Sequence, residues 1–221
     1  MNKKSLKMIE VKNLFYRQGN FNLNIPYKQF PEKGIILLTG SSGSGKSTFL
    51  NVLSGLLKCP SLVWNFKGQN LASLKPSQRG INYCFQDLRL FPVMTVKENI
   101  FFVLKAKKIS FKQKEKDFEE IVDILNLKSC LNRSLEKLSG GEKQRTALAR
   151  TLISPCEILF LDEPFSYLDE RNQERARFLV KSYVKKHSLP LFLVSHEKEK
   201  DVSSQILFNK GCIVNNLKNL S

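Results

Sequence analysis

A short segment rich in glycine and serine contains the residue types that bind phosphate groups. It fits the pattern G-x-x-x-x-G-K-[ST] and consists of Gly40, Ser41, Ser42, Gly43, Ser44, Gly45, Lys46, Ser47 and Thr48. Glycines accept positive φ, so several backbone N–H groups can converge on a phosphate tail. We expect Lys46 to reach the β and γ phosphates of a bound phosphate tail, Ser47 to give its hydroxyl to Mg²⁺, and Thr48 to bond a phosphate oxygen.

Two adjacent acids, Asp162 and Glu163, follow four apolar residues that indicate a buried strand. In open α/β sheets, ligands bind at the carboxyl ends of the strands. Asp162 is therefore predicted to hold Mg²⁺, directly or through water, as phosphoryl transfer requires. Glu163 is placed to act as general base on the attacking water. The alternative is that both acids only cap the following loop.

A third segment, residues 138–145, reads Leu-Ser-Gly-Gly-Glu-Lys-Gln-Arg. Ser139 and Glu142 have the spacing of a capping box, which predicts that a helix begins here. Gly140 and Gly141 leave the first backbone N–H groups of that helix uncovered, so the segment is a candidate second anion site. An ordinary helix start explains the capping box but not the two glycines, which weaken a helix start.

Together these motifs resemble the ATP-binding cassette (ABC) ATPase family, the nucleotide-binding subunits of ABC transporters. Residues 40–48 resemble its Walker A motif, Gln86 its Q-loop glutamine, and residues 138–145 its signature. Asp162 and Glu163 resemble its Walker B motif, residues 166–169 its D-loop, and His196 its switch histidine. The match covers nearly the whole chain in the family's order.

The resemblance implies a head-to-tail homodimer in which each ATP is enclosed by two chains. Glu163, His196 and Gln86 would be the catalytic residues, with Gln86 reaching the Mg²⁺ that Ser47 and Asp162 also hold. Across the dimer, the ATP contacts from the second chain would be Ser139, Gly140, Gly141 and Asp169. For the aromatic residue that stacks on adenine we choose Tyr16; Phe15 lies beside it, and the family's spacing also allows Gln18.

The elements that must position these residues alternate between strands and helices. Strands are predicted at 8–16, 21–25, 35–39, 62–66, 81–85, 158–161 and 191–195, with a closing hairpin around residues 210–211. Helices are predicted at 46–57, 96–107, 113–127, 141–153 and 169–186. This alternation predicts an α/β fold. In family terms it is a P-loop NTPase (RecA-like) core with an N-terminal antiparallel β subdomain and an inserted helical subdomain. The single ABC ATPase domain, 1–221, would divide into a core of 1–86 and 155–221 and a helical part of 87–154.

The chain has 221 residues with 42% hydrophobic and 25% charged positions, which excludes disordered, collagen and coiled-coil classes. Its net charge of +16 favours anionic partners or reflects coding bias. The five scattered cysteines are interpreted as reduced core residues. No signal peptide or membrane span is recognisable. We therefore expect a cytoplasmic protein that reaches the cytoplasmic face of the inner or plasma membrane only through a partner.

The function expected from the resemblance is that of the ATPase subunit of an ABC transporter, working with separate transmembrane permease subunits and a second ATPase subunit. The alternative is a soluble ABC ATPase of a non-transport complex, such as iron–sulfur cluster assembly. A repair ATPase would need a long coiled coil between Gln86 and Leu138, and that interval is too short. No nucleic-acid module supports a DNA or RNA partner.

Overall fold

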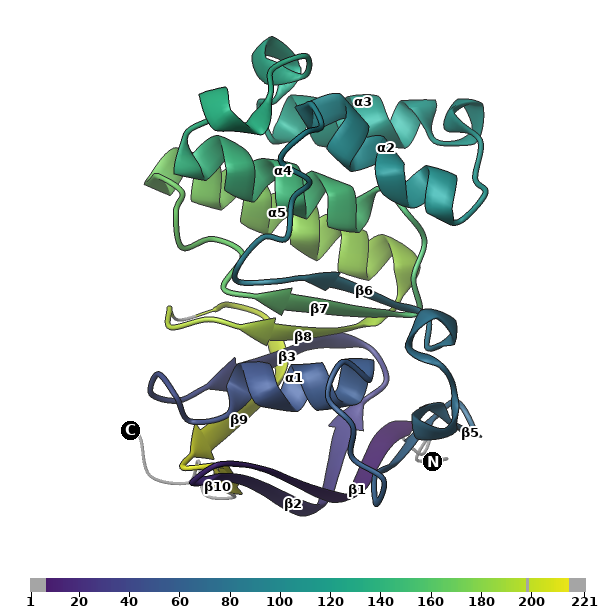
Figure 1. Ribbon diagram of the computed structural model, residues 1–221, viewed down its shortest axis with the longest axis vertical. Coiled ribbons are helices and arrows are strands. Elements are labelled where there is room, and N and C mark those ends of the chain that lie inside the picture. The colour runs from purple at the N-terminus through teal and green to yellow at the C-terminus, as the bar shows by residue number, and fades with distance from the viewer. Residues whose placement is uncertain (1–6, 198, 215–221) are drawn as a thin grey trace, which may run out of the picture. The chain divides into compact units, whose positions relative to one another are not determined.

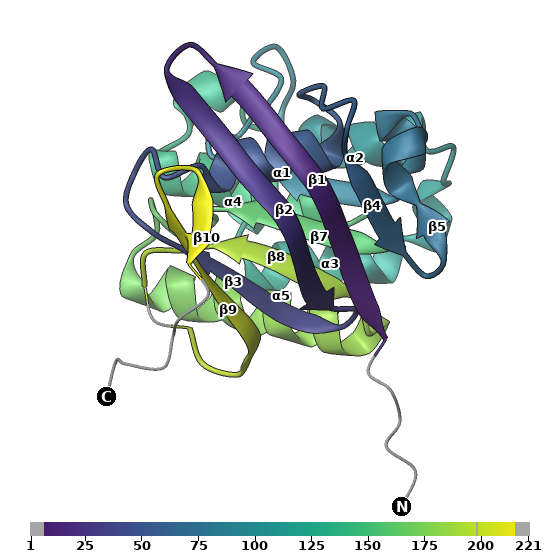
Figure 2. The same ribbon diagram turned by 90° about the horizontal axis from the view of Figure 1, so that it is seen from below.

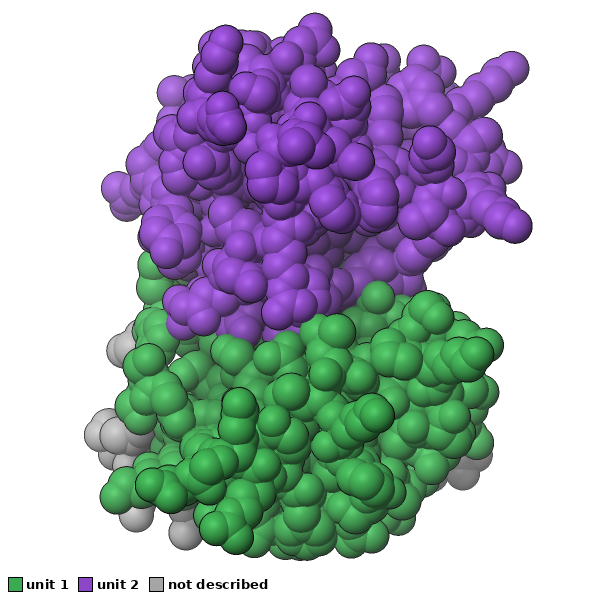
Figure 3. Space-filling model, viewed as in Figure 1, with its two compact units in different colours: residues 1–81, 157–160, 188–221 green, residues 82–156, 161–187 purple. Residues whose placement is uncertain are grey.

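The computed structural model describes residues 7–197 and 199–214. They divide into two compact units (Figure 3). Unit 1 comprises residues 1–81, 157–160 and 188–221, and unit 2 comprises residues 82–156 and 161–187. Each unit is described by itself. The division of the chain into a core and a helical part at residues 86 and 155 stays a prediction.

Unit 1 contains most of the strands. They are β1 (Met8–Gln18), β2 (Phe21–Pro31), β3 (Gly34–Thr39), β4 (Val63–Phe66), β5 (Gln69–Asn70), β8 (Pro190–Val194), β9 (Val202–Asn209) and β10 (Cys212–Val214). Its helices are α1 (Lys46–Ser54) and the short 3₁₀ helices η1 (Leu71–Ser73) and η2 (Pro76–Gln78). Strands β6 (Ile81–Cys84) and β7 (Ile158–Asp162) each have residues assigned to both units.

The strands of unit 1 form parts of two sheets. One is antiparallel, with the order β2-β1-β4-β5. Figure 2 shows β1 and β2 as a long hairpin, which pairs Gln18 with Phe21 across the predicted turn. In the other sheet β3 lies between β9 and β8 and is parallel to both. This central position explains the continuous apolar run of β3, because both of its faces are buried.

Aromatic side chains fill the core of unit 1. Phe30, Phe49 and Phe192 contact one another, with ring centroids 5.2–6.3 Å apart, and Phe208 lies 5.4 Å from Phe49. Phe49 and Leu53 come from the buried side of α1. These contacts fix α1, and with it the loop that precedes the helix, against the sheet.

Helix α1 is shorter than predicted because it ends at Ser54 and not at residue 57. Gly55 adopts a left-handed conformation with φ 82°, and its N–H bonds the helix carbonyls. The buried guanidinium of Arg79 donates to the carbonyl oxygen of Leu53 over 2.6 Å. It also lies where a β-carbon on residue 55 would be. Arg79 therefore closes the carboxyl end of α1.

Unit 2 is mainly helical. Its helices are α2 (Val96–Ala106), α3 (Glu115–Ile124), α4 (Gly140–Leu152) and α5 (Glu170–His187), with 3₁₀ turns η3 (Phe111–Gln113), η4 (Lys128–Cys130) and η5 (Leu135–Lys137). Helix α2 packs on α4, and α3 packs on both α4 and α5 (Figure 1). Capping boxes begin α2 at Thr95 and α4 at Ser139, as the sequence predicts for α4.

Several predicted boundaries and one group of burial predictions are wrong. Helix α3 begins at Glu115 because the preceding residues form η3, and β9 begins four residues earlier than predicted because its backbone pairs with β3. All five cysteines are free. Cys84 and Cys130 are buried as predicted, but Cys59 and Cys156 are half-buried and Cys212 is exposed on the short strand β10.

Among the helices formed by residues 7–197 and 199–214, none has an apolar stretch of the length that a bilayer crossing needs.

Candidate functional site

The loop between β3 and α1 has the conformation that its glycines predict. Gly40, Gly43 and Gly45 have φ values of 138°, 74° and 108°. A β-carbon on Gly40 would overlap the carbonyl oxygen of Phe208, and one on Gly45 would lie 2.9 Å from the ring of Phe21. Glycine is therefore required at both positions, by backbone conformation and by the space available.

Lys46 is almost fully buried at the start of α1. Its Nζ donates to the carbonyl oxygens of Gly40 and Ser41, each over 2.9 Å. The ammonium group thus lies over the loop, where a bound phosphate would lie next to it. Ser47 and Thr48 follow in the first turn of the helix and are half-buried.

Ser44 is the unusual residue of this loop. Its side chain is buried, and its Oγ has no hydrogen-bond partner among the residues that the structure describes. Its carbonyl oxygen accepts from the N–H of Gly211, in the turn between β9 and β10. A buried hydroxyl without a partner is costly. The Ser44 hydroxyl can donate a hydrogen bond to a phosphate oxygen, so the residues of the loop fit a bound nucleotide.

The other predicted site residues of unit 1 lie outside the loop. Tyr16 is half-buried near the end of β1, and its hydroxyl donates to Oε1 of Gln18, another candidate for the adenine contact. Phe15, the third, is 49% exposed. His196 is exposed two residues beyond the end of β8. The choice among the three adenine candidates stays a prediction.

In unit 2, Asp162 ends β7 and is buried. The phenol of Tyr83 donates to its Oδ2 over 3.5 Å. Burial, together with the charge of Asp162, raises the pKa of Tyr83 well above its usual range, so the phenol keeps its proton.

The predicted base, Glu163, has a left-handed backbone with φ 49°. The side-chain amide of Gln86 donates to its Oε2 over 3.4 Å. The structure therefore brings together two of the three predicted catalytic residues, both within unit 2. Their pairing orients a carboxylate and an amide toward the same small region, as the activation of a water molecule requires.

The predicted signature lies at the amino end of α4. Ser139 accepts from the N–H of Glu142 over 3.2 Å, and Oε2 of Glu142 accepts from the N–H of Ser139 over 2.8 Å. These hydrogen bonds, with that from the backbone of Ser139 first, lower the pKa of Glu142. Ser139 and Gly140 are exposed and Gly141 is half-buried. The start of α4 therefore leaves glycine backbone open to solvent.

Asp169, predicted to contact ATP from the second chain, already has a structural role in this chain. Its Oδ1 accepts from the N–H of Asn172 over 2.9 Å, and its Oδ2 accepts from the Asn172 side chain over 2.6 Å. These bonds lower the pKa of Asp169. Its carboxylate thus caps the start of α5, and the contact with ATP stays a prediction.

Sequence reasoning gave no role to several polar residues that contact the predicted ones, Asn172 among them. Tyr83 on β6 donates to the carboxylate of Asp162. On α4, Gln144 donates to the backbone of Glu163, and Arg150 donates to the backbone of the segment that follows Gln86. For the two residues of α4, the available signal was the apolar side of that helix. Polar residues on the same side must also be buried, and buried polar groups need hydrogen-bond partners.

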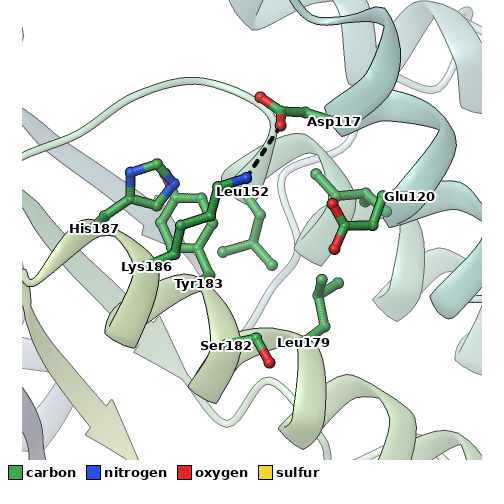
Figure 4. Close-up of a pocket in the computed structure, with 9 residues that line it drawn as sticks. Asp117, Glu120, Leu152, Leu179, Ser182, Tyr183, Lys186 and His187 are labelled. Atoms are coloured by element: carbon green, nitrogen blue, oxygen red, sulfur yellow. Dashed lines mark hydrogen bonds and ion pairs between the residues drawn. The ribbon is translucent and has the colours of Figure 1, made fainter.

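A further cavity of unit 2 involves none of the predicted site residues. It lies between α3 and α5, beside Asp117, Tyr183, Lys186 and His187 (Figure 4). Asp117 already pairs with Lys114 over 2.7 Å and with Lys186 over 3.5 Å. Within the described residues, no three His, Cys, Asp or Glu side chains are grouped so that they could hold a metal ion.

Comparison with known families identifies the class of protein. The family model described as ABC transporter matches residues 23–166, so the chain belongs to that family. A dimeric structure of the ATP-binding cassette MJ0796, in a post-hydrolysis state bound to ADP and Pi, is similar with a TM-score of 0.82 and 26% identity. The match covers 93% of this chain and 96% of that one.

Two further structures agree. The dimeric structure of MJ0796, described as a bacterial ABC transporter cassette, matches with a TM-score of 0.79 and 25% identity over 93% of this chain and 96% of that one. An ATP-binding subunit of an ABC transporter has the same fold, with a TM-score of 0.82 and 21% identity over 93% and 88% of the two chains. The α/β fold with its N-terminal antiparallel sheet and the resemblance to ABC ATPases are thereby confirmed.

Proposed function

We propose that this chain is the ATP-binding and ATP-hydrolysing subunit of an ABC transporter. It forms a head-to-tail homodimer around two ATP molecules and drives separate transmembrane subunits from the cytoplasmic face of the membrane. The observation that carries the proposal is the exposed start of α4. Gly140 is exposed and Gly141 half-buried, and neither has a side chain of its own, although the capping box itself is complete.

The exposed start of α4 is suited to an anion from another molecule, and a nucleotide in the phosphate loop of a second copy would supply one. A γ phosphate held by Lys46 of one chain would accept hydrogen bonds from Gly140 and Gly141 of the other. The positive end of α4 favours negative charge there. Two such contacts form per dimer, and both depend on the terminal phosphate, so ATP binding promotes association and release of that phosphate after hydrolysis reverses it. The similar MJ0796 cassettes are dimeric, which supports a homodimer.

The donor set also fits Mg²⁺. Ser47, Asp162 and Gln86 supply hydroxyl, carboxylate and amide oxygens, which are the ligand types that this ion prefers. When bound, Mg²⁺ would neutralise charge on the phosphate oxygens. The chain's own residues perform the remaining steps. Glu163 accepts the proton of the attacking water, Gln86 orients that water, and His196 bonds the γ phosphate.

The test is Glu163→Gln, which keeps the size of the side chain but removes the base. We expect ATP binding to be retained, turnover to fall by roughly a hundredfold or more, and dimer to accumulate on gel filtration with ATP. Glu157→Gln, at an exposed acid that pairs with Lys67, is the matched control. Turnover near that of the wild type, or a strictly monomeric Glu163→Gln protein with ATP, contradicts the proposal.

The transmembrane partner is proposed to bind the segment after Gln86. Val93 in this segment is 94% exposed, and Phe102 on the neighbouring helix α2 is 38% exposed, with its ring 4.3 Å from that of Phe91. We expect Val93→Asp to abolish co-purification with membrane proteins and Phe178→Asp, at an exposed residue of α5, to leave it intact. Co-purification with soluble proteins alone favours the assembly-type ATPase instead.

A further inference from the structure

The segment that follows Gln86 in unit 2 has an uncommon backbone. Leu88 and Arg89 both have positive φ, at 58° and 44°, although neither is glycine. Such residues cost free energy and persist only where the surroundings hold them in place. Leu88 lies only two residues after Gln86. A contact that fixes the backbone of Leu88 and Arg89 therefore also limits the direction of the Gln86 side chain.

The group that holds them is Arg150, from the buried side of α4. One terminal nitrogen of its guanidinium donates to the carbonyl oxygen of Arg89 and the other to that of Leu88, each over 2.7 Å. The planar fork of arginine matches two adjacent carbonyls, and an ammonium group has no equivalent geometry. Arg150 thus bridges both left-handed residues.

Further contacts fix the same segment on both sides. The Arg89 guanidinium lies 3.9 Å from the ring centroid of Phe85 and pairs with Asp87 over 3.1 Å. Downstream, the fully buried Asn99 accepts from the N–H of Phe91 over 2.8 Å and donates back to its carbonyl. Arg150 adds a link between this segment and α4.

Helix α4 also reaches the residue that faces Gln86. Gln144, one turn into the helix, donates to the carbonyl oxygen of Glu163 over 3.3 Å, and Glu163 is itself left-handed. The side chains of Gln86 and Glu163 meet at 3.4 Å. The same helix therefore holds the backbone on both sides of this pair.

We propose that Arg150 is a positioning residue for Gln86: it holds Leu88 and Arg89 in the left-handed conformation that places the Gln86 amide on Glu163. The inference rests on the proposed function, because the consequence is a slower hydrolysis step. It also ties the position of Gln86 to α4, whose N-cap is Ser139, so a shift of that helix moves the water-orienting amide.

The kinetic test is a double-mutant cycle between Arg150→Met and Gln86→Ala. We expect Arg150→Met to lower kcat roughly tenfold to a hundredfold with little change in KM, because a small misplacement of a reacting group has that effect. In the Gln86→Ala background it should lower kcat by less than about twofold, since the two residues act as one unit. Lys107→Met, which removes a cation bound to Asn82 and to the carbonyl of Pro155, is the control and should lower kcat equally little in both backgrounds.

A second readout does not depend on activity. Release of the segment should accelerate trypsin cleavage after Arg89 in Arg150→Met relative to the wild type and to Lys107→Met. Arg150→Lys, which keeps the charge but not the fork, should fall between them in both assays. It also replaces Arg150→Met in the cycle if that variant does not fold.

Equal effects of the Arg150 substitution in the two backgrounds, or unchanged cleavage after Arg89, overturn the inference. Absence of ATP hydrolysis by the wild-type protein overturns the proposed function instead. The cleavage rates then decide by themselves whether Arg150 holds the segment.

Discussion

The carbonyl oxygen of Tyr167 lies so close to Gly141 that a β-carbon on residue 141 would be 3.1 Å from it. The adjacent Gly140 has more room, because a β-carbon there would meet only the Cβ of Tyr167, at 4.0 Å. The two glycines of the signature are thus required for different reasons. Gly141 allows the segment 166–169 to pack on the first turn of α4, whereas Gly140 leaves that turn open to solvent.

This difference predicts opposite stabilities for Gly140→Ala and Gly141→Ala. Alanine is favoured over glycine in a helix by about 1 kcal/mol, so Gly140→Ala should raise the free energy of unfolding. Gly141→Ala should lower it, because relieving the contact with Tyr167 costs about 1–3 kcal/mol. Urea unfolding measures both. ATPase activity should fall in both variants, since each adds a methyl group to the surface proposed to meet the nucleotide. Equal unfolding midpoints would contradict the packing argument.

The buried hydroxyl of Ser44 predicts a variant that separates binding from stability. Ser44→Ala removes a group without a partner, so the free energy of unfolding without nucleotide should stay the same or rise by about 1 kcal/mol. ATP binding should weaken by about tenfold, because a hydrogen bond to a charged phosphate is lost. Isothermal titration calorimetry and thermal unfolding provide the two measurements.

Ser54→Ala is the matched control for Ser44→Ala. Ser54 is the last residue of α1 and is also buried, but its hydroxyl donates to the carbonyl oxygen of Asn51 over 3.0 Å. Its loss should lower stability by about 1 kcal/mol and leave ATP binding unchanged. A destabilised Ser44→Ala protein with normal ATP affinity would show that Ser44 has a structural partner and no role in binding.

Glu142 predicts a pH dependence of stability. Its pKa is lowered from 4.5, mainly by the hydrogen bond from the N–H of Ser139. The folded state therefore binds the proton less tightly than the unfolded state does. The stabilisation is fully present above the unfolded value and is lost as the pH falls through the lower folded value.

Glu142→Gln removes this dependence because its amide does not titrate. The difference in unfolding free energy between wild type and Glu142→Gln should be largest at neutral pH and should shrink below about pH 4.5. Chemical denaturation at a series of pH values measures it, with Glu136→Gln, at an exposed acid in η5, as the control. A difference that does not vary with pH would mean that the ionised Glu142 carboxylate does not stabilise the folded state more than its protonated form does.

Local patterns predicted most of the elements and both glycine-rich segments. The apolar run of β3 followed by glycines, and the capping box at Ser139, depend on interactions between residues close in the chain. Such interactions are readable because backbone preferences act over a few residues. The ends of elements were predicted less well. Helix α1 ends at Gly55, whose left-handed conformation is supported by Arg79 from a distant segment.

By itself, the sequence determined the residue types of the glycine-rich loop, the signature and the acidic pair and the order in which they follow. It also predicted their part in phosphate chemistry, since glycine, lysine and acidic residues act through their intrinsic chemistry. Only the tertiary structure decided which side chains hold them. Arg150 lies 61 residues from Arg89, and Gln144 lies 19 from Glu163. These partners meet because α4 packs its polar and apolar residues inward together. No local preference predicts such a meeting, because it depends on burying polar groups only where a distant carbonyl can accept their hydrogen bonds.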